Sequence, residues 1–320
     1  MRPANASALP EPIEVILTAI ELTARDTNLF TFARPNRGPL PPAEAGAHIG
    51  LNLPGSIERQ YSLVHPHSEP RSYTVGVKRE ASGGGGSRAV HELRVGARLT
   101  IEPPRNNFPL DMAAEKTVLI AGGIGVTPIF CMMQALDAAG RDWTLYYSAR
   151  SREDAALIDW LDGRERVRFH FDDEAGGYFP MGSVIVGIPP EAHLYCCGPA
   201  PMLAAFEAAC AGRPPANVHV EYFTAKHAAA TEGGFTVELA KTGGEFGIPA
   251  GKSILHVLQE AGIDVASSCE EGVCGACETR VISGTPDHRD AILSDDERLA
   301  NETMMICCSG CKSDRLVLDL

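Results

Sequence analysis

Hydrophobic residues in the first third of the chain form short runs, several with alternating apolar and polar positions, and proline or glycine separates the runs. Short strands at regular spacing with turn residues between them are typical of an antiparallel barrel or sandwich. The sequence therefore predicts a β-rich domain over residues 1–109. Its predicted strands are 14–22, 28–33, 61–64, 72–78 and 98–101, and a helical pattern occupies 89–93.

The pattern changes near Pro109, where strand-like apolar runs begin to alternate with helical ones. A helical run at 128–139 lies between apolar runs at 117–121 and 143–148. Such alternation is typical of a parallel sheet with crossover helices. We therefore expect an α/β domain over residues 110–225.

A small, polar segment without periodicity, 226–233, is predicted to be a linker. After it come a strand pattern at 235–239, a turn at 241–244 and a short helix from 253 to 261. The last part of the chain, 234–320, is therefore predicted to be a compact α+β domain.

Composition narrows the functional classes. The chain has 320 residues, enough for two or three domains, and its net charge of −13 argues against a nucleic-acid partner. No run approaches the ~20 apolar residues that a membrane span needs, and the N-terminus lacks the apolar stretch of a secretory signal. We therefore expect a cytoplasmic protein without a membrane partner. In that reducing compartment its ten cysteines indicate metal ligation rather than disulfides.

The last domain is strongly acidic. Residues 234–320 hold fifteen Asp and Glu against seven Lys and Arg. Such a surface could steer a basic partner protein, or it could be only a solvated face.

Four cysteines near the C-terminus carry the strongest chemical signal. Cys269, Cys274 and Cys277 have the C-x4-C-x2-C spacing of a plant-type [2Fe–2S] ferredoxin loop, and Cys307 can supply the distant fourth thiolate. Small residues between these cysteines leave room for backbone N–H groups to approach the inorganic sulfurs. The spacing therefore predicts a [2Fe–2S] cluster.

A four-cysteine zinc site is the alternative. Cys274 and Cys277 with Cys308 and Cys311 give two C-x2-C pairs. The gap between the pairs is longer than the roughly 15–20 residues usual for that pattern, and two of the well-spaced cysteines would be unused.

Two strand ends in the α/β domain are candidate nucleotide sites. The run from Gly122 to Pro128 joins a strand to a helix, with Thr127 as the expected cap, and its glycines would let backbone amides approach a pyrophosphate. A tight structural turn is the alternative. Cys197-Gly198-Pro199 follows another strand, so Cys197 should lie at the same edge of the sheet, although a packed small side chain is its commoner role.

Two segments of the first domain could bind a phosphate. Arg59 and Tyr61 would share one face of a strand beside Ser62, which suits a ligand with a phosphate and an aromatic ring. The glycine run 83–86 with Ser87 leads into a helical pattern, a second phosphate-binding arrangement. An ordinary barrel strand and a flexible surface loop are the respective alternatives.

Taken in this order, these motifs resemble the phthalate dioxygenase reductase family, which includes vanillate O-demethylase reductases and related Rieske-oxygenase reductases. The resemblance extends over nearly the whole chain. Its motifs are Arg59-x-Tyr61-Ser62, Gly86-Ser87, Gly122-Gly123-x-Gly125-x-Thr127-Pro128, Cys197-Gly198-Pro199, Glu221-x-Phe223 and the cysteine loop. It implies a multidomain fold with an antiparallel β-barrel flavin domain of the ferredoxin reductase type, an α/β parallel-sheet nucleotide domain and an α+β, β-grasp ferredoxin domain.

The resemblance also implies cofactor contacts, with FMN as the flavin. The expected flavin contacts are Arg59 and the Gly86-Ser87 loop at the phosphate, Tyr61 and Ser62 along the isoalloxazine, Thr74, Val75 and Val77 on the adjacent strand, and Phe223 over the ring. The expected nucleotide contacts are Gly122, Gly123, Thr127, Cys197 and Pro199, with Cys197 and Pro199 near the nicotinamide. Cys197, Ser62 and Phe223 are the candidate catalytic residues, and Cys269, Cys274, Cys277 and Cys307 the metal ligands.

One local departure concerns the fourth thiolate. The family tail usually reads Cys-Val-Ser-Arg, whereas this chain has Cys307-Cys308-Ser309-Gly310. Alignment on Ile306 makes Cys307 the ligand and Cys308 a replacement for valine. Ligation by Cys308 is the alternative.

The implied activity is electron transfer from NADH through FMN and the cluster to a separate Rieske-type oxygenase that hydroxylates or O-demethylates a small aromatic compound, with the reductase a monomer. A reductase for a di-iron monooxygenase or a cytochrome is one alternative, and a non-enzymatic metal- and nucleotide-binding module is another. The family habit favours NADH, and Asp172 or Asp173 would repel an added phosphate, although Arg150 could bind a 2′-phosphate.

Overall fold

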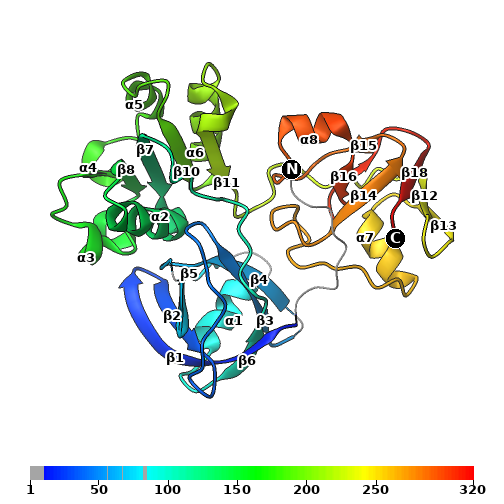
Figure 1. The fold of residues 1–320 in the computed structure, drawn as a ribbon, viewed down its shortest axis with the longest axis horizontal. Helices are drawn as coiled ribbons and strands as arrows, with labels where there is room; N and C mark the ends of the chain where they lie inside the picture. Colours follow the sequence, from blue (N-terminus) through cyan, green and yellow to red (C-terminus); the bar gives the residue numbers. More distant parts are fainter. Residues whose placement is uncertain (1–10, 56, 67, 82–84) are drawn as a thin grey trace. The chain divides into compact units, whose positions relative to one another are not determined.

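The computed structural model describes residues 11–55, 57–66, 68–81 and 85–320. It divides into two compact units, one over residues 11–221 and the other from Tyr222 to Leu320. The first contains both the β-rich and the α/β domain, and the second contains the cysteine loop (Figure 1).

The β-rich domain is a six-stranded antiparallel barrel with strand order β4-β3-β6-β1-β2-β5. Its elements are β1 (Ile13–Ala24), β2 (Thr27–Ala33), β3 (His48–Leu53), β4 (Ile57–Ser62), β5 (Ser72–Lys78), α1 (Gly86–Glu92) and β6 (Arg98–Ile101). A bridge between Leu63 and Val75 joins the two edge strands, and the N–H of Val64 donates to the carbonyl of Thr74 at 2.9 Å. The barrel fold predicted from the sequence is confirmed.

The sequence analysis missed β3 and began β4 four residues too late. Strand β3 is buried at every position except Asn52, which is half-buried: Ile49 and Leu51 enter the barrel core, and Gly50 is buried on the other face. Glycine weakens a strand signal. A Cβ on Gly50 would lie 2.9 Å from Glu58 Oε1 and 3.1 Å from Glu102 Cγ, so these side chains would have to shift to admit a larger residue. Helix α1 likewise begins three residues earlier than its pattern indicated.

The α/β domain has a five-stranded parallel sheet of order β11-β10-β7-β8-β9, as predicted. Its strands are β7 (Lys116–Gly122), β8 (Asp142–Ala149), β9 (Val167–Phe171), β10 (His193–Cys197) and β11 (Val218–Glu221). Its helices are α2 (Val126–Ala138), α3 (Ile158–Leu161), α4 (Asp172–Ala175), α5 (Met181–Val186) and α6 (Ala200–Cys210), with short 3-10 turns η1 (Gly123–Gly125), η2 (Arg152–Asp154) and η3 (Pro215–Asn217).

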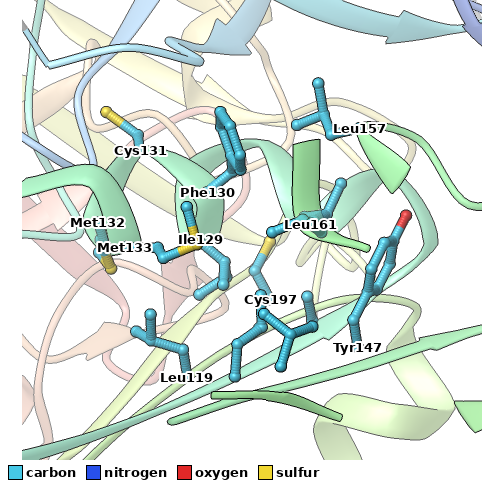
Figure 2. Close-up of a cluster of buried hydrophobic side chains, with 14 of the residues drawn as sticks. Leu119, Ile129, Phe130, Cys131, Met132, Met133, Tyr147, Leu157, Leu161 and Cys197 are labelled. Carbon is cyan, nitrogen blue, oxygen red and sulfur yellow. The ribbon is translucent and has the colours of Figure 1, made fainter. Parts of the chain in front are cut away.

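One hydrophobic core joins this sheet to the barrel. Helix α2 contributes Ile129, Phe130 and Met133, and the barrel contributes Leu29 and Val64. Figure 2 shows the α2 side chains packed beside those of the sheet. A polar contact adds to this interface, since Gln134 Nε2 donates to the carbonyl of Val64 at 2.8 Å. The barrel and the nucleotide domain are therefore held in a fixed relation within the first unit.

The second unit is a mixed five-stranded sheet of order β13-β12-β18-β14-β16 with a small β15-β17 ribbon, in accord with the predicted β-grasp fold. Its elements are β12 (Phe235–Leu239), β13 (Glu245–Ile248), α7 (Ile254–Glu260), β14 (Glu278–Ser283), β15 (Pro286–Asp287), α8 (Asp295–Ala300), β16 (Thr303–Met305), β17 (Gly310–Cys311) and β18 (Arg315–Leu318). The side chain of Ser253 caps α7 by accepting the N–H of His256. Ile254, Leu255 and Leu258 of α7 are buried in the core of this unit.

The boundary between the two units lies at Glu221 and Tyr222, four residues before the predicted end of the nucleotide domain. In the predicted linker, Ala230 is buried, and its N–H donates to the carbonyl of Cys308 at 2.8 Å. Part of this segment is therefore attached to the second unit. Across the described residues, none of the helices has the length and apolar character required to cross a bilayer.

Candidate cofactor sites

The four cysteines with ferredoxin spacing come together as two pairs. Cys269 is hydrogen-bonded to Cys274 in the loop before β14, and Cys277 is hydrogen-bonded to Cys307, which follows β16. All but Cys269 are buried. A [2Fe–2S] cluster takes two protein ligands on each of its two irons. The paired thiols therefore fit such a cluster.

Backbone N–H groups point at these sulfurs. The N–H of Glu271 donates to Cys269 Sγ at 3.4 Å, and the N–H of Ala276 donates to Cys274 Sγ at 3.5 Å. Gly272 between them has a φ of +71°. A left-handed φ and the close packing of the loop both favour glycine at this position. The donated N–H bonds stabilise the thiolate form that iron binds.

Cys307 and Cys308 are neighbouring candidates for the fourth ligand. Cys307 Sγ accepts hydrogen bonds from the thiols of Cys277 and Cys308 and from the N–H of Gly272, and these bonds lower the pKa of Cys307 to about 4. The pKa of Cys308 is raised, mainly by the hydrogen bond that its thiol makes to Cys307 and secondly by burial. A Cβ on Gly272 would lie against Cys308 Sγ, so the Cys308 thiol also reaches the loop. The assignment of Cys307 as the fourth ligand therefore stays a prediction.

The zinc alternative is not supported. Cys311 Sγ donates to the carbonyl of Ser313 at 2.8 Å and does not join the other cysteines. Over the residues that the structure describes, no three His, Cys, Asp or Glu side chains converge on a single-ion site. A two-iron cluster does not require such convergence, because its thiolates bind in separate pairs.

The candidate phosphate site of the barrel brings Arg59 of β4 against the start of α1. A Cβ on Gly86 would lie 2.4 Å from Arg59 Cγ, so the helix begins directly against this side chain. The Ser87 hydroxyl accepts the N–H of Glu80 at 3.1 Å and keeps its own hydrogen for another acceptor. Gly83 and Gly84 of the predicted glycine loop lie outside the described residues. A guanidinium, a serine hydroxyl and backbone N–H groups together fit a phosphate.

The remaining flavin candidates divide between two faces of the barrel wall. Tyr61 packs at the edge of the barrel core, where burial raises its pKa to about 12. Val75 and Val77 are buried in that core, so only their backbone can reach a cofactor. Thr74 points to the other face, where its hydroxyl lies 3.0 Å from the Thr31 hydroxyl.

The flavin strand and the nucleotide loop meet at one point. A Cβ on Gly76 of β5 would lie 2.7 Å from Thr127 Cγ2 and 3.6 Å from Ile124 Cδ1. Gly76 was not among the predicted site residues. An isolated glycine inside a strand pattern signals a close approach and could have identified it. This contact places the predicted flavin contacts of β5 next to the predicted nucleotide loop.

Thr127 does not cap α2, contrary to the sequence analysis. The helix begins at Val126 with Gly125 at the cap position, and the Thr127 hydroxyl donates to the carbonyl of Ile124 at 3.0 Å. The physical reason is the 3-10 turn at Gly123–Gly125, which leads into the helix without a side-chain cap. Thr127 is buried and contacts the barrel, so its part in nucleotide binding stays a prediction.

The ends of β7 and β10 are packed backbone against backbone. A Cβ on Gly125 would lie 2.3 Å from the carbonyl oxygen of Cys197, and one on Gly122 would lie 2.7 Å from Pro199 Cδ. Gly123, with a φ of +52°, faces open space. Gly122 and Gly125 therefore let the two strand ends pack closely, and the open side of Gly123 is where a pyrophosphate could approach backbone amides.

The Cys197 thiol is buried inside the core and not exposed in a cleft. Figure 2 shows it beside Leu119, Ile129 and Leu161. Burial raises its pKa well above the usual thiol value, and the thiol donates a hydrogen bond to Glu221, its neighbour on β11. Its predicted role near the nicotinamide is untested.

Glu221 is an unusual carboxyl group. Its Oε2 is buried and has no hydrogen-bond partner among the described residues. Burial raises the pKa of Glu221 to about 8, and the hydrogen bond from Cys197 opposes this shift. The sequence analysis quoted Glu221 only as part of a motif, because no local pattern signals that a carboxyl group is buried.

Two other candidates are Arg150 in the first unit and Phe223 in the second. Arg150 is exposed after β8, and its carbonyl accepts the N–H of Asp173 at 3.1 Å. The predicted 2′-phosphate partner and the acidic residue that would repel such a phosphate are therefore neighbours. Phe223 falls in the second unit and is 39% exposed, and its place over a flavin stays a prediction.

Comparisons with known proteins agree with an iron–sulfur cluster in the last domain. Residues 237–312 match the family model of the 2Fe-2S iron-sulfur cluster binding domain. The chain is 51% identical over 318 residues to phenoxybenzoate dioxygenase subunit beta of Ectopseudomonas oleovorans, which covers 99% of this chain and 100% of that protein. It is 44% identical over 316 residues to the vanillate O-demethylase oxidoreductase of Pseudomonas sp. strain HR199, with 96% of this chain and 100% of that protein covered.

A solved structure has the same architecture. The structure of phthalate dioxygenase reductase, described as modular for electron transfer from pyridine nucleotides to [2Fe–2S], matches with a TM-score of 0.72 and 40% identity. The match covers 97% of this chain and 98% of that one.

Proposed function

The chain belongs to the phthalate dioxygenase reductase family, and we propose that it passes electrons from NADH through FMN and its [2Fe–2S] cluster to a separate Rieske-type oxygenase. It is an oxidoreductase of the kind that links a pyridine nucleotide, a flavin and an iron–sulfur centre. The observation that carries the proposal is the pairing of Cys269 with Cys274 and of Cys277 with Cys307.

The bound flavin supplies the chemistry of accepting a hydride from the nicotinamide and releasing electrons singly. The barrel's part is to hold its phosphate with Arg59 and Ser87 and to keep the ring beside β5. The glycines at the strand ends hold the pyrophosphate of the nucleotide. Contact of Thr127 with Gly76 keeps the two binding sites adjacent, which supports direct transfer between the two rings.

The cluster loop supplies the exit for electrons. Glu270 and Glu271 are exposed in this loop, directly after Cys269. Negative charge beside the cluster favours an acceptor protein with a basic face, consistent with the acidic composition of residues 234–320. The relatives named for a dioxygenase and an O-demethylase support an oxygenase as that acceptor. We further propose that the reductase is monomeric and cytoplasmic.

NADH is the proposed donor rather than NADPH. Asp173 lies beside Arg150, where the adenosine ribose is expected, and its charge opposes an added 2′-phosphate. Initial rates with the two nucleotides test this choice. Equal or faster turnover with NADPH would reverse it.

Anaerobic titration of the purified protein with NADH tests the whole proposal. We expect the flavin absorbance to bleach first and the cluster bands to follow, and extraction should release FMN. A colourless protein without iron and sulfide would refute the proposal in favour of a binding module. FAD in the extract would favour the monooxygenase or cytochrome reductase alternative.

A further inference from the structure

A group of charged side chains around the fully buried Asp290 lies behind the cysteine loop, and no motif singled it out. We call His288, Asp290 and Arg298 the Asp290 triad. The Asp290 side chain is 0% exposed, and its Oδ1 accepts the N–H groups of Ile292 at 2.9 Å and Leu293 at 2.8 Å. Arg298 Nη2 lies 3.9 Å from Oδ1, and His288 Nδ1 lies 3.9 Å from Oδ2.

The triad is incompletely paired. Among the described residues, His288 Nδ1, Asp290 Oδ2 and Arg298 Nε are all buried without a hydrogen-bond partner. Burying charged groups costs several kcal/mol per ion, and replacing such a set by apolar residues is often neutral or stabilising. Arg298 Nη2 donates to the Asp290 carbonyl at 2.7 Å, which holds the backbone but leaves the charge of the Asp290 carboxylate only partly compensated.

Their position relates them to the metal ligands. The N–H of Ala291 donates to the carbonyl of Gly272 at 2.9 Å, and a Cβ on Gly272 would lie 3.1 Å from Asp290 Cα. The N–H of Arg289 donates to the Ser309 hydroxyl at 3.1 Å. Residues 289–291 thus connect the loop that carries three of the cysteines with the turn that carries the fourth.

We propose that Asp290 and Arg298 are positioning residues that set the reduction potential of the cluster through opposite charges behind its binding loop, a buried carboxylate and a half-buried guanidinium. The potential of an iron–sulfur cluster depends on local charge, on hydrogen bonds to sulfur and on solvent exposure. Reduction adds one negative charge, so the buried carboxylate opposes it and the nearby guanidinium favours it. The inference rests on the proposed function in that the cluster must be present.

The test is the midpoint potential of the cluster in the full-length protein, measured by redox titration with electron paramagnetic resonance of the reduced cluster. Asp290→Asn should raise the potential and Arg298→Gln should lower it. Each shift should reach about tenfold in the equilibrium constant for reduction, which is about 59 mV for a one-electron couple. Asp295→Asn is the matched control, because Asp295 also lies 3.5 Å from Arg298 but is 96% exposed, and its potential should be that of the unaltered protein.

Opposite signs distinguish an electrostatic role from damage to the fold, which would move both variants in the same direction. Should Asp290→Asn fail to retain the cluster, Arg298→Gln and Arg298→Lys decide, because lysine keeps the charge and should keep the potential. Shifts of equal sign, or shifts no larger than that of Asp295→Asn, overturn the inference. An unaltered protein without a reducible cluster would instead overturn the proposed function itself.

Discussion

The buried Glu221 carboxyl should make the stability of the nucleotide domain fall as the pH rises. Its pKa is about 8 in the folded protein, against 4.5 for an unperturbed glutamate. Between these two values the folded state keeps a proton that the unfolded state has released. The unfolded state therefore binds fewer protons, and the free energy of unfolding decreases with rising pH throughout this interval.

The size of the effect follows from the same two values. Each pKa unit corresponds to about 1.4 kcal/mol, so the interval from pH 4.5 to pH 8 gives an upper limit of about 5 kcal/mol. Below pH 4.5 both states are protonated and the carboxyl contributes nothing. Above pH 8 both are ionised, and the full loss is reached.

The perturbation is Glu221→Gln, which keeps the shape and removes the titration. Relative to this variant, the unaltered protein should have equal stability near pH 4.5 and should become progressively less stable toward pH 8. Both tryptophans of the chain, Trp143 and Trp160, lie in the nucleotide domain. Urea unfolding followed by tryptophan fluorescence at several pH values therefore reports on this domain.

Two further variants sharpen the test. Glu191→Gln removes an exposed carboxyl of the same domain and should leave the pH dependence unchanged. Cys197→Ala removes the thiol that donates to Glu221, so the pKa of Glu221 should rise further and the loss of stability should extend to higher pH. Parallel stability curves for the unaltered protein and Glu221→Gln from pH 4.5 to pH 8 would refute the reasoning.

Other predictions concern the cofactor sites. Cys307→Ser should lose the cluster and its iron, whereas Cys308→Val should keep both; iron and sulfide assays of the two proteins check this, and a cluster retained in the first would reassign the ligand. Gly125→Ala places a Cβ 2.3 Å from the carbonyl of Cys197, so NADH affinity should fall at least about tenfold while flavin content is unchanged, as measured by titration; unaltered affinity would contradict it. Arg59→Ala should be purified without flavin but with its cluster bands, and a normal ratio of flavin to cluster would argue against the phosphate contact.

The sequence predicted correctly those strands whose alternation and flanking turns lie within a few residues. Strands β5, β6 and β12 have the bounds expected from their alternation, because each begins and ends at turn residues. The cysteine spacing likewise predicted two thiol pairs that are close together in the structure. Three of the four expected cluster ligands are close together in the sequence, so their spacing alone predicts the site. The fold is needed only to bring the distant Cys307 to them.

Predictions failed where a local rule competed with a tertiary contact. Threonine is a residue type that often caps helices. In the structure, however, the Thr127 methyl group packs against Gly76 of the barrel and its hydroxyl donates to the carbonyl of Ile124. Strand β3 was missed because Gly50 weakens its pattern, although that glycine lies against the Glu58 side chain of the neighbouring strand. In both cases the residue type serves a contact with a partner distant in sequence.

The two buried carboxyls show why the electrostatics of such sites cannot be read from the sequence. Glu221 is buried because the register of β11 sets it beside Cys197, and Asp290 is buried because the segment that carries it packs under Gly272. An aspartate or glutamate is usually exposed, so a sequence analysis assigns both to the surface. Burial makes the Glu221 carboxyl lower the stability as the pH rises, and the lower local dielectric strengthens the effect of both carboxyls on a neighbouring charge. The variants Glu221→Gln and Asp290→Asn therefore test the same physical claim at the entry and at the exit of the proposed electron path.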